Sequence, residues 1–287
     1  MAVKTGKSKL KEALSIASKK CDLIRLQDII QIVRAIIWTG RVSGENAVSL
    51  CLVAPQESAK SQCLLYFYET ETLRYFSDIT AKPLNALKRD IETKKLRHLV
   101  LLDLIQIMNH QKSVANRTLQ RLAGLMEEGQ AAVADAGGVE EWKGLPKIGV
   151  LMALTPSYYL DQRARWYKSG FITRFLRVWF TYTDTTIDQV HTAISRGMPL
   201  PQQHKEELPE DAQLVTLHPA QAEAIEGLAR SHAGTEVGIY GFRYHRQQRA
   251  LAKALALMDS RHEVADKDIT VISSWQRYFT GSRPVEI

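Results

Sequence analysis

The sequence predicts an α/β fold, in which a parallel sheet carries helices on both faces and a smaller, mainly helical domain follows. Apolar strand patterns alternate with helical patterns as far as about residue 185, and parallel strands need such alternation because each crossover usually takes a helix. Two of the strands, 96–104 and 148–156, are apolar almost throughout, as expected for strands buried on both faces. We therefore expect a basic tail at 1–22, an α/β domain at 23–185 and a helical lid domain at 186–287.

The elements of the α/β domain are predicted from hydrophobic periodicity and helix ends. Apolar residues at helical spacing in "LIRLQDIIQIVRAIIWTGR" predict an amphipathic helix before the first strand. The pattern "SVANRTLQRLAGLMEEG" ends at a glycine, and we expect a loop to join it to the last strand. In chain order the patterns give a helix at 23–41, a strand at 47–55, a helix from Ser58, a strand at 72–80, a helix at 83–95, a strand at 96–104, a helix at 113–129 and a strand at 148–156.

The chain changes character from about residue 185. The stretch "SRGMPLPQQHKEELPEDAQ" combines proline, glycine and charge, which is typical of a linker. We therefore place a domain boundary near 185–212. Beyond it, 219–233 and 241–261 have helical patterns, and these predict the smaller domain.

The composition is that of a globular protein, for which we expect a cytoplasmic location. The 287 residues are 45% hydrophobic, enough for a substantial core, and no apolar run approaches the roughly 20 residues that cross a bilayer. Three cysteines without metal-ligand spacing predict reduced, mostly buried thiols. The net charge is +7, and residues 1–25 contribute +5, from seven Lys or Arg residues against two acidic ones. A tail of this kind either contacts nucleic-acid phosphates or only solubilises the chain.

The stretch "LVAPQESAKSQ" contains the Lys-Ser pair of a phosphate-binding loop (P-loop). In the pattern G-x-x-x-x-G-K-[ST], backbone N–H groups hold the phosphates, the lysine bridges the terminal ones and the hydroxyl contacts Mg²⁺. Here alanine stands at both glycine positions; this restricts the backbone but does not forbid binding, since alanine supplies N–H donors wherever φ is negative. The candidate nucleotide-binding residues are Ala54, Gln56, Glu57, Ser58, Ala59, Lys60 and Ser61.

Polar residues elsewhere occupy positions that suit the same site. Asp103 ends the strand "LVLLD", where an aspartate either holds the hydration shell of Mg²⁺ or caps the next helix. Thr155 ends the next buried strand, Arg174 lies in a short helix within "SGFITRFLRVWF", and Arg243 begins the long C-terminal helix. Either arginine has a plainer interpretation, in a local ion pair or on a solvated helix face. The candidate metal ligands are Ser61 and Asp103, and the candidate catalytic residues are Thr155, Arg174 and Arg243.

Together these motifs resemble an AAA+ ATPase module, and they are most similar to the minichromosome-maintenance-like helicase and chelatase branch. "GFITRFL" resembles that branch's "sRFdl" segment, whose arginine reaches the nucleotide of a neighbouring subunit; this gives Arg174 that role. "FRYHRQQRALAKALALMDSRHEVADKDI" resembles the lid helix, which places the second-sensor arginine at Arg243. The resemblance covers about residues 40–280, and it implies ATP and Mg²⁺ as ligands and an oligomeric ring or filament.

The chain departs from that family where hydrolysis is concerned. Leu104 follows Asp103, where the family usually places the glutamate that polarises the attacking water. Gln106, Asn109 and Glu57 are candidate substitutes. ATP binding is therefore better supported than hydrolysis.

The resemblance implies an ATP-binding protein that assembles side by side and loads, remodels or translocates on DNA. The basic tail or a loop near 129–147 would contact the DNA. Two alternatives stay open. One is a degenerate, non-hydrolysing AAA+ scaffold or adaptor, which works alone or beside an active AAA+ or replication partner; the other is a DNA-binding protein that does not depend on nucleotide.

Overall fold

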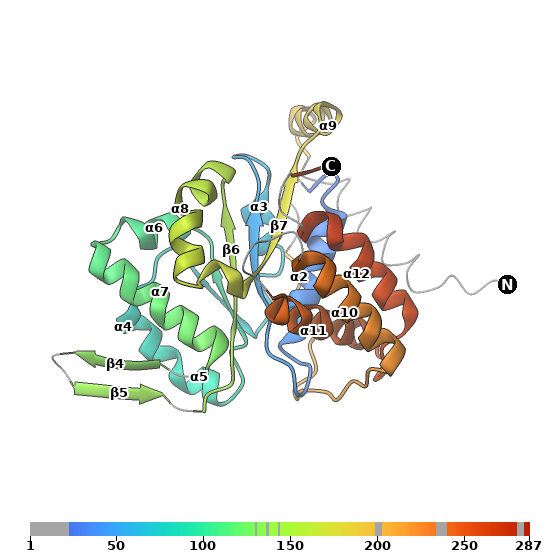
Figure 1. The fold of residues 1–287 in the computed structure, drawn as a ribbon. Helices are drawn as coiled ribbons and strands as arrows, with labels where there is room; N and C mark the ends of the chain where they lie inside the picture. The colour runs from blue at the N-terminus through green and yellow to red at the C-terminus, as the bar shows by residue number, and fades with distance from the viewer. Residues whose placement is uncertain are drawn as a thin grey trace.

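The structure, a computed structural model, describes residues 23–129, 131–135, 138–142, 144–198, 203–233, 240–279 and 284–287. Within these ranges, six strands form one parallel sheet in the order β2-β3-β6-β1-β7-β8. The predicted α/β class with a parallel sheet is confirmed (Figure 1). The strands are β1 (Ser49–Val53), β2 (Leu73–Phe76), β3 (His98–Leu101), β6 (Gly149–Leu154), β7 (Phe175–Thr181) and β8 (Val285–Glu286).

Strand β1 lies inside the sheet, between β6 and β7. The chain leaves β1 for β2 on one side, and it later leaves β6 for β7 on the other side of β1. In open parallel sheets, ligands bind beyond the carboxyl ends of the strands where the order reverses in this way. The loop that follows β1, residues 54–59, lies at that point.

Alternate residues of the central strands enter two separate apolar cores. On β1, Leu50 and Leu52 belong to one core, and Cys51 and Val53 belong to the other. This alternation is expected for a sheet covered on both faces. The first core includes residues of α2 (Gln27–Thr39), α3 (Lys60–Leu65), α10 (Pro219–Ala233), α11 (Phe242–Met258) and α12 (Asp266–Phe279), and the second includes residues of α4 (Ala81–Leu84), α5 (Lys88–Glu92), α6 (Leu104–Asn109), α7 (Lys112–Glu127) and α8 (Pro156–Lys168).

Several elements after residue 129 differ from the sequence-based expectation. The segment expected to be a loop contains an antiparallel hairpin, β4 (Ala131–Asp135) and β5 (Gly138–Trp142). The alanine-rich first strand hides the strand pattern, because alanine is a poor strand former. Helix α8 and strand β7 were not predicted, and α9 (Asp184–Ser195) occupies the start of the expected linker.

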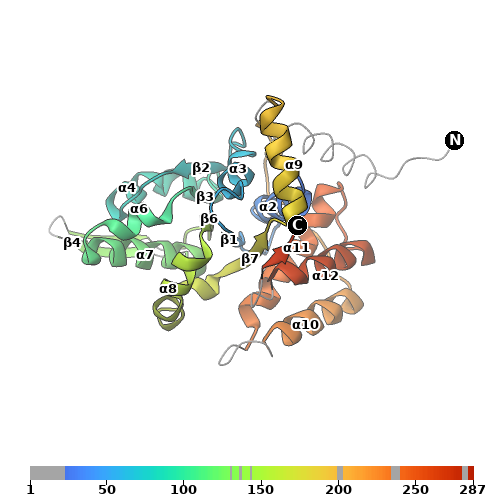
Figure 2. The same ribbon diagram turned by 90° about the horizontal axis from the view of Figure 1, so that it is seen from above.

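The C-terminal helices share a core with the sheet. Helix α11 packs along α2, and α12 packs against β7 (Figure 2). Apolar residues from β1, α2, α11 and α12 belong to one continuous cluster. The helical character of this part is as expected, whereas a lid domain divided from the sheet near 185–212 stays a prediction.

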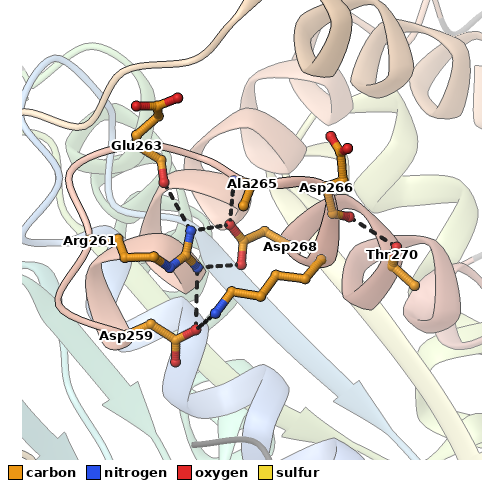
Figure 3. Close-up of polar contacts among 8 residues, drawn as sticks. Asp259, Arg261, Glu263, Ala265, Asp266, Asp268 and Thr270 are labelled. Carbon is orange, nitrogen blue, oxygen red and sulfur yellow. Dashed lines mark hydrogen bonds and ion pairs between the residues drawn. The ribbon is translucent and has the colours of Figure 1, made fainter. Parts of the chain in front are cut away.

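An arginine brace holds the turn between α11 and α12 (Figure 3). Arg261 donates from Nη1 and Nη2 to the two carboxylate oxygens of Asp268, over 3.0 and 2.7 Å. Asp268 Oδ2 also accepts from the backbone N–H of Ala265 at 2.8 Å, and Arg261 Nη2 donates to Asp259 at 3.3 Å. Because this bidentate pair is geometrically specific and Asp268 is buried, it fixes the orientation of the two helices.

The segment that joins α9 to α10 is held against α2 by one buried carboxylate. Glu206 accepts from Arg34 Nε and Trp38 Nε1, each at 2.7 Å, and pairs with His204 Nε2 at 2.9 Å. Burial by itself raises the pKa of Glu206, but the hydrogen bonds from His204, Arg34 and Trp38 outweigh burial and lower the pKa to about 2. His204 stacks on Tyr66, which directly follows α3. These contacts therefore tie α3, the helix that follows the loop after β1, to α2.

Two further sequence predictions concern cysteines and membranes. Cys51 and Cys63 are buried and take part in no disulfide within the described residues, as predicted, whereas Cys21 and the whole basic tail at 1–22 lie outside those residues. None of the helices in the described ranges is long and apolar enough to cross a bilayer.

Candidate nucleotide site

The loop after β1 adopts a backbone conformation that usually requires glycine. Glu57 has a φ of 61° and Ala59 a φ of 56°, and such left-handed conformations cost a residue with a side chain about 1–2 kcal/mol. The condition of a negative φ, under which alanine was expected to supply an N–H donor, is therefore not met at Ala59. Alanine at the second glycine position of the phosphate-loop pattern thus adopts the backbone geometry that glycine favours.

The Lys60 side chain folds back over this loop. Its Nζ donates to the backbone oxygen of Ala54 at 2.8 Å, to that of Pro55, and to Ser58 Oγ at 3.2 Å. Burial lowers the pKa of the Lys60 amine to about 8, because desolvation disfavours the charged form. Its partners in the loop are neutral oxygens, which the oxygens of a phosphate can replace.

The remaining loop residues face solvent to different degrees. Gln56, Glu57 and Ser61 are exposed, whereas Ser58 is buried and donates from Oγ to the backbone oxygen of Pro55 at 2.7 Å. Glu57 has no ion-pair partner within the described residues. Its carboxylate adds negative charge at the mouth of the loop and opposes triphosphate binding there.

Asp103 caps a helix, which is one of its two predicted roles. Its Oδ1 accepts from the backbone N–H of Ile105 at 2.9 Å, at the start of α6, and its Oδ2 accepts from Gln106 Nε2 at 3.3 Å. Strand β3, which precedes Asp103, is two strands away from β1. The cap is confirmed, and the role in metal binding stays a prediction.

The predicted magnesium ligands are one hydroxyl, from Ser61, and one carboxylate, from Asp103. Mg²⁺ often takes only one or two carboxylate ligands and completes its shell with phosphate oxygens and water. The exposed hydroxyl of Ser61 and the partly exposed carboxylate of Asp103 meet that modest requirement. Within the described ranges, no group of three or more His, Cys, Asp or Glu side chains is arranged to hold a metal by itself. The residues present thus fit a magnesium ion that arrives with its phosphates.

The position after Asp103 offers no base for hydrolysis. Leu104 is completely buried in the second core. Of the candidate substitutes, Gln106 is exposed and bonded to Asp103, and Asn109 and Glu57 are exposed.

Thr155 lies beside the loop. Strand β6 pairs with β1 through Leu154 and Val53, and the backbone N–H of Ala54 donates to the oxygen of Leu154 at 3.2 Å. The hydroxyl of Thr155 accepts from the backbone N–H of Tyr158 at 3.4 Å and caps α8. The predicted strand-end position is confirmed, and contact with a phosphate stays a prediction.

Arg174 and Arg243 converge on one carboxylate, Glu127 at the end of α7. Arg174 Nε lies 3.3 Å from Glu127 Oε2, and Arg243 Nε donates to both oxygens of Glu127, at 3.1 and 2.9 Å. Arg243 Nη1 also donates to Thr173 Oγ1 at 3.0 Å. Burial lowers the pKa of Arg174, and the nearby Glu127 carboxylate opposes that shift. The structure thus brings the two predicted arginines together and shows both in a local ion pair.

A basic cavity of about 300 Å³ opens beside this arginine pair. The segment before β1, the end of α7 and the first turns of α11 form its walls, and the carboxylates among its lining residues are Glu45 and Glu127. Arg249 is bonded to Glu45, whereas Lys147 and Arg246 have no ion-pair partner within the described part of the chain. With Arg174 and Arg243, the cavity has an excess of positive charge that suits an anion.

The lysine loop and the arginine pair lie at opposite edges of the sheet. The loop follows Val53 at the carboxyl end of β1, whereas Arg174 precedes Phe175, which pairs with Ser49 at the amino end of β1. Four residue steps separate these ends, roughly 13 Å at about 3.3 Å per residue. Within one chain, Lys60 and Arg174 therefore lie toward opposite ends of β1.

Glu127 and Lys147 are the site residues that sequence reasoning missed. Glu127 lies 116 residues from Arg243 in the chain, and no local motif marks it. Lys147 belongs to "KGLPK", where the pattern indicated only a loop. Long-range pairs of this kind are visible only after the chain has folded.

The segment near 129–147 has a charge that does not favour the DNA contact expected for it. It contains Asp135, Glu140 and Glu141 against Lys143 and Lys147, a net charge of −1. Phosphate contacts come mainly from positive side chains. The DNA contact through this segment stays a prediction.

In comparisons with known proteins, no protein-family model and no curated protein matches the chain. The fold and the site define a class: an α/β protein with a parallel sheet, a lysine loop at one edge and an arginine pair at the other.

Proposed function

We propose that this chain binds ATP with Mg²⁺ at the Lys60 loop and that a second copy completes the site with its own Arg174 and Arg243. The observation that carries the proposal is the separation of these groups to opposite edges of one sheet. A chain that carries complementary half-sites on two edges assembles head to tail. Heterologous contacts of this kind close into a ring or continue as a filament.

Each residue has a defined task in the proposed complex. Lys60 binds the terminal phosphates in place of the loop oxygens that it now contacts, Ser61 and Asp103 hold Mg²⁺, and Thr155 lies beside the γ-phosphate. The bound ion supplies neutralisation of the phosphate charge. Arg174 and Arg243 of the next copy exchange Glu127 for the γ-phosphate, so that assembly depends on the triphosphate.

The assembled protein would load, remodel or translocate on DNA. The net charge of +7 and the basic cavity support an anionic polymer as partner. The sequence resemblance to helicase-like AAA+ modules favours DNA over other anions.

A non-hydrolysing scaffold or adaptor is the second candidate, and Leu104 favours it. A fully buried leucine cannot polarise water, and Gln106 is already bonded to Asp103. In this case the nucleotide holds the assembly together without turnover, or an active AAA+ partner supplies the missing group. A DNA-binding protein without nucleotide dependence is the third candidate, and its affinity for DNA would fall steeply with salt and ignore ATP.

Binding of a fluorescent ATP analogue with Mg²⁺ separates these candidates when phosphate release is followed in the same samples, with and without DNA. The proposal expects binding by the wild type, loss of at least about tenfold in affinity for Lys60→Ala, and partial retention for Lys60→Arg, because a single charge-assisted contact contributes about 1.5–3 kcal/mol. Binding without phosphate release identifies the scaffold. Absence of ATP-analogue binding by the wild type overturns the proposal of a nucleotide site.

A further inference from the structure

Two aromatic rings lie unusually exposed at the start of α11. Tyr240 is 82% exposed and Phe242 is 69% exposed, and their rings are stacked with centroids 5.7 Å apart and an interplanar angle of 18°. Exposed apolar groups that are gathered together, rather than scattered, usually mark a binding surface. We call this pair the aromatic ledge.

The backbone holds the ledge in place. Gly241, between the two rings, has a φ of 79°, and a Cβ at this position would lie 2.9 Å from the backbone oxygen of Ala229. The chain therefore needs glycine here, both for the left-handed conformation and for the close approach to α10. The oxygen of Gly241 then accepts from the backbone N–H of His245 at 2.8 Å, in the first turn of α11. The ledge is built on an anchored turn.

A cavity of about 580 Å³ lies beside the ledge. Tyr240 and Phe242 border it, and a second stacked pair, His232 and Tyr244, lines it with ring centroids 3.8 Å apart. This volume is in the range of small-molecule sites. His232 and Tyr244 are buried, so the faces on which a flat ring can stack are those of the exposed Tyr240 and Phe242.

Arginines complete the lining of the same cavity. Arg177 is buried and donates from Nη1 to the hydroxyls of Tyr159 and Tyr167. Arg246 is exposed and has no ion-pair partner within the described part of the chain. The carboxylate of the lining, Glu127, is already bonded to Arg243. Stacking faces combined with spare positive charge suit a ligand with an aromatic base and a phosphate.

We propose that the aromatic ledge and its cavity bind unpaired bases of single-stranded nucleic acid. Bases stack on the rings of Tyr240 and Phe242, and Arg246 contacts the adjoining phosphate. Stacking of this kind is sequence-tolerant and contributes about 1–3 kcal/mol per base. The site gives the proposed action on DNA a definite contact, and in that respect it rests on the proposed function, but it needs neither ATP nor Lys60.

The test measures fluorescence anisotropy of a labelled twelve-nucleotide oligo(dT) without nucleotide, at salt high enough to weaken contacts from the basic tail. The full-length double variant Tyr240→Ala with Phe242→Ala should lose at least about tenfold in affinity, since two stacking faces are removed. The pair Tyr240→Phe with Phe242→Tyr should keep wild-type affinity. Leu214→Ala is the matched control, because Leu214 is a 68% exposed apolar side chain away from both cavities. Arg246→Ala should reduce the slope of log affinity against log salt concentration by about one, which corresponds to the loss of one phosphate contact.

Three outcomes would overturn the proposal. The first is unchanged oligo(dT) binding by the double alanine variant. The second is equal affinity for dTMP and for the strand, which would assign the cavity to a free nucleotide. The third is a change of self-association in sedimentation, without a change of oligo(dT) binding, in the double alanine variant. This result would make the ledge a contact between copies. Failure of ATP binding by the wild type would leave this test unaffected, so the two proposals fail separately.

Discussion

The two edges of the sheet each carry positive side chains, but these side chains are satisfied in different ways. At the carboxyl edge, Lys60 donates to neutral oxygens of its own loop. At the amino edge, Arg174 and Arg243 share the charged carboxylate of Glu127. Replacing a neutral oxygen with a phosphate gains charge–charge attraction, whereas replacing a carboxylate with a phosphate exchanges one anion for another.

This difference predicts an order of events. The lysine loop should bind ATP in an isolated chain, because exchanging the neutral loop oxygens around Lys60 for phosphate oxygens is favourable without a second copy. The arginine pair should engage a phosphate only when a neighbouring copy presents it at short range, since the Glu127 ion pair must break first. Assembly would then follow nucleotide binding.

The largest expected effect comes from removing the arginine pair. The double variant Arg174→Ala with Arg243→Ala should weaken ATP-dependent self-association by at least about 100-fold, because two charge-assisted contacts of about 1.5–3 kcal/mol each are lost. Binding of ATP by the isolated chain should stay within about twofold of the wild type. Sedimentation velocity with and without ATP measures self-association, and titration with a fluorescent ATP analogue measures ATP affinity.

Arg277→Ala is a suitable control for that variant, because Arg277 is also a partly exposed arginine in an ion pair, with Asp28. It should leave ATP-dependent association unchanged. Loss of ATP binding in the double arginine variant would contradict the separation of the two edges.

The next effect concerns pH and the lysine edge. Burial lowers the pKa of Lys60 to about 8, and a bound phosphate would raise it again by pairing with the ammonium. In the complex the Lys60 amine keeps a proton that it loses above about pH 8 in the free loop. Above that pH, ATP affinity should therefore fall about tenfold per pH unit. Titrations between pH 7 and 9.5 test this, and Lys60→Arg should show a flat profile. A flat profile in the wild type would mean that the amine does not contact phosphate.

A smaller effect is expected from the strained loop. Ala59→Gly should raise the free energy of unfolding by about 1 kcal/mol, because glycine adopts a φ of 56° without the Cβ penalty. Ala54→Gly should lower it, since Ala54 is completely buried and lacks a positive φ. Urea unfolding of both variants measures the two changes. Destabilisation by Ala59→Gly would show that the left-handed conformation at this position is not costly.

The fold was predictable where long, strongly patterned segments decide the structure. The strand expected at 96–104 appears as β3, with all four residues buried, and the helix expected at 219–233 appears as α10 with the same bounds. The elements β4 and β7 were missed for local reasons. Alanine hides the strand pattern in β4, and β7 follows directly on the short 3₁₀ turn that ends at Arg174.

The candidate site was predictable only as separate pieces. Asp103 and Thr155 follow strand ends, and Lys60 begins the helix after the loop that follows β1. Strand ends and the Lys-Ser pair can be recognised in the sequence. The left-handed backbone of Ala59 was not predictable, because only the folded loop imposes it against the preference of alanine. The pairing of Arg174 and Arg243 on Glu127, and the aromatic ledge at Tyr240, depend on contacts between distant segments.

The central claim is that one chain's Lys60 edge is completed by another chain's arginine edge, and a mixing experiment tests it most directly. Lys60→Ala keeps only a working arginine edge, and Arg174→Ala with Arg243→Ala keeps only a working lysine edge. Labelled with a donor and an acceptor dye, the two variants should each fail to self-associate in ATP, and their mixture should form a heterodimer with energy transfer that disappears without ATP. A mixture that behaves as the sum of the two separate variants would contradict the account.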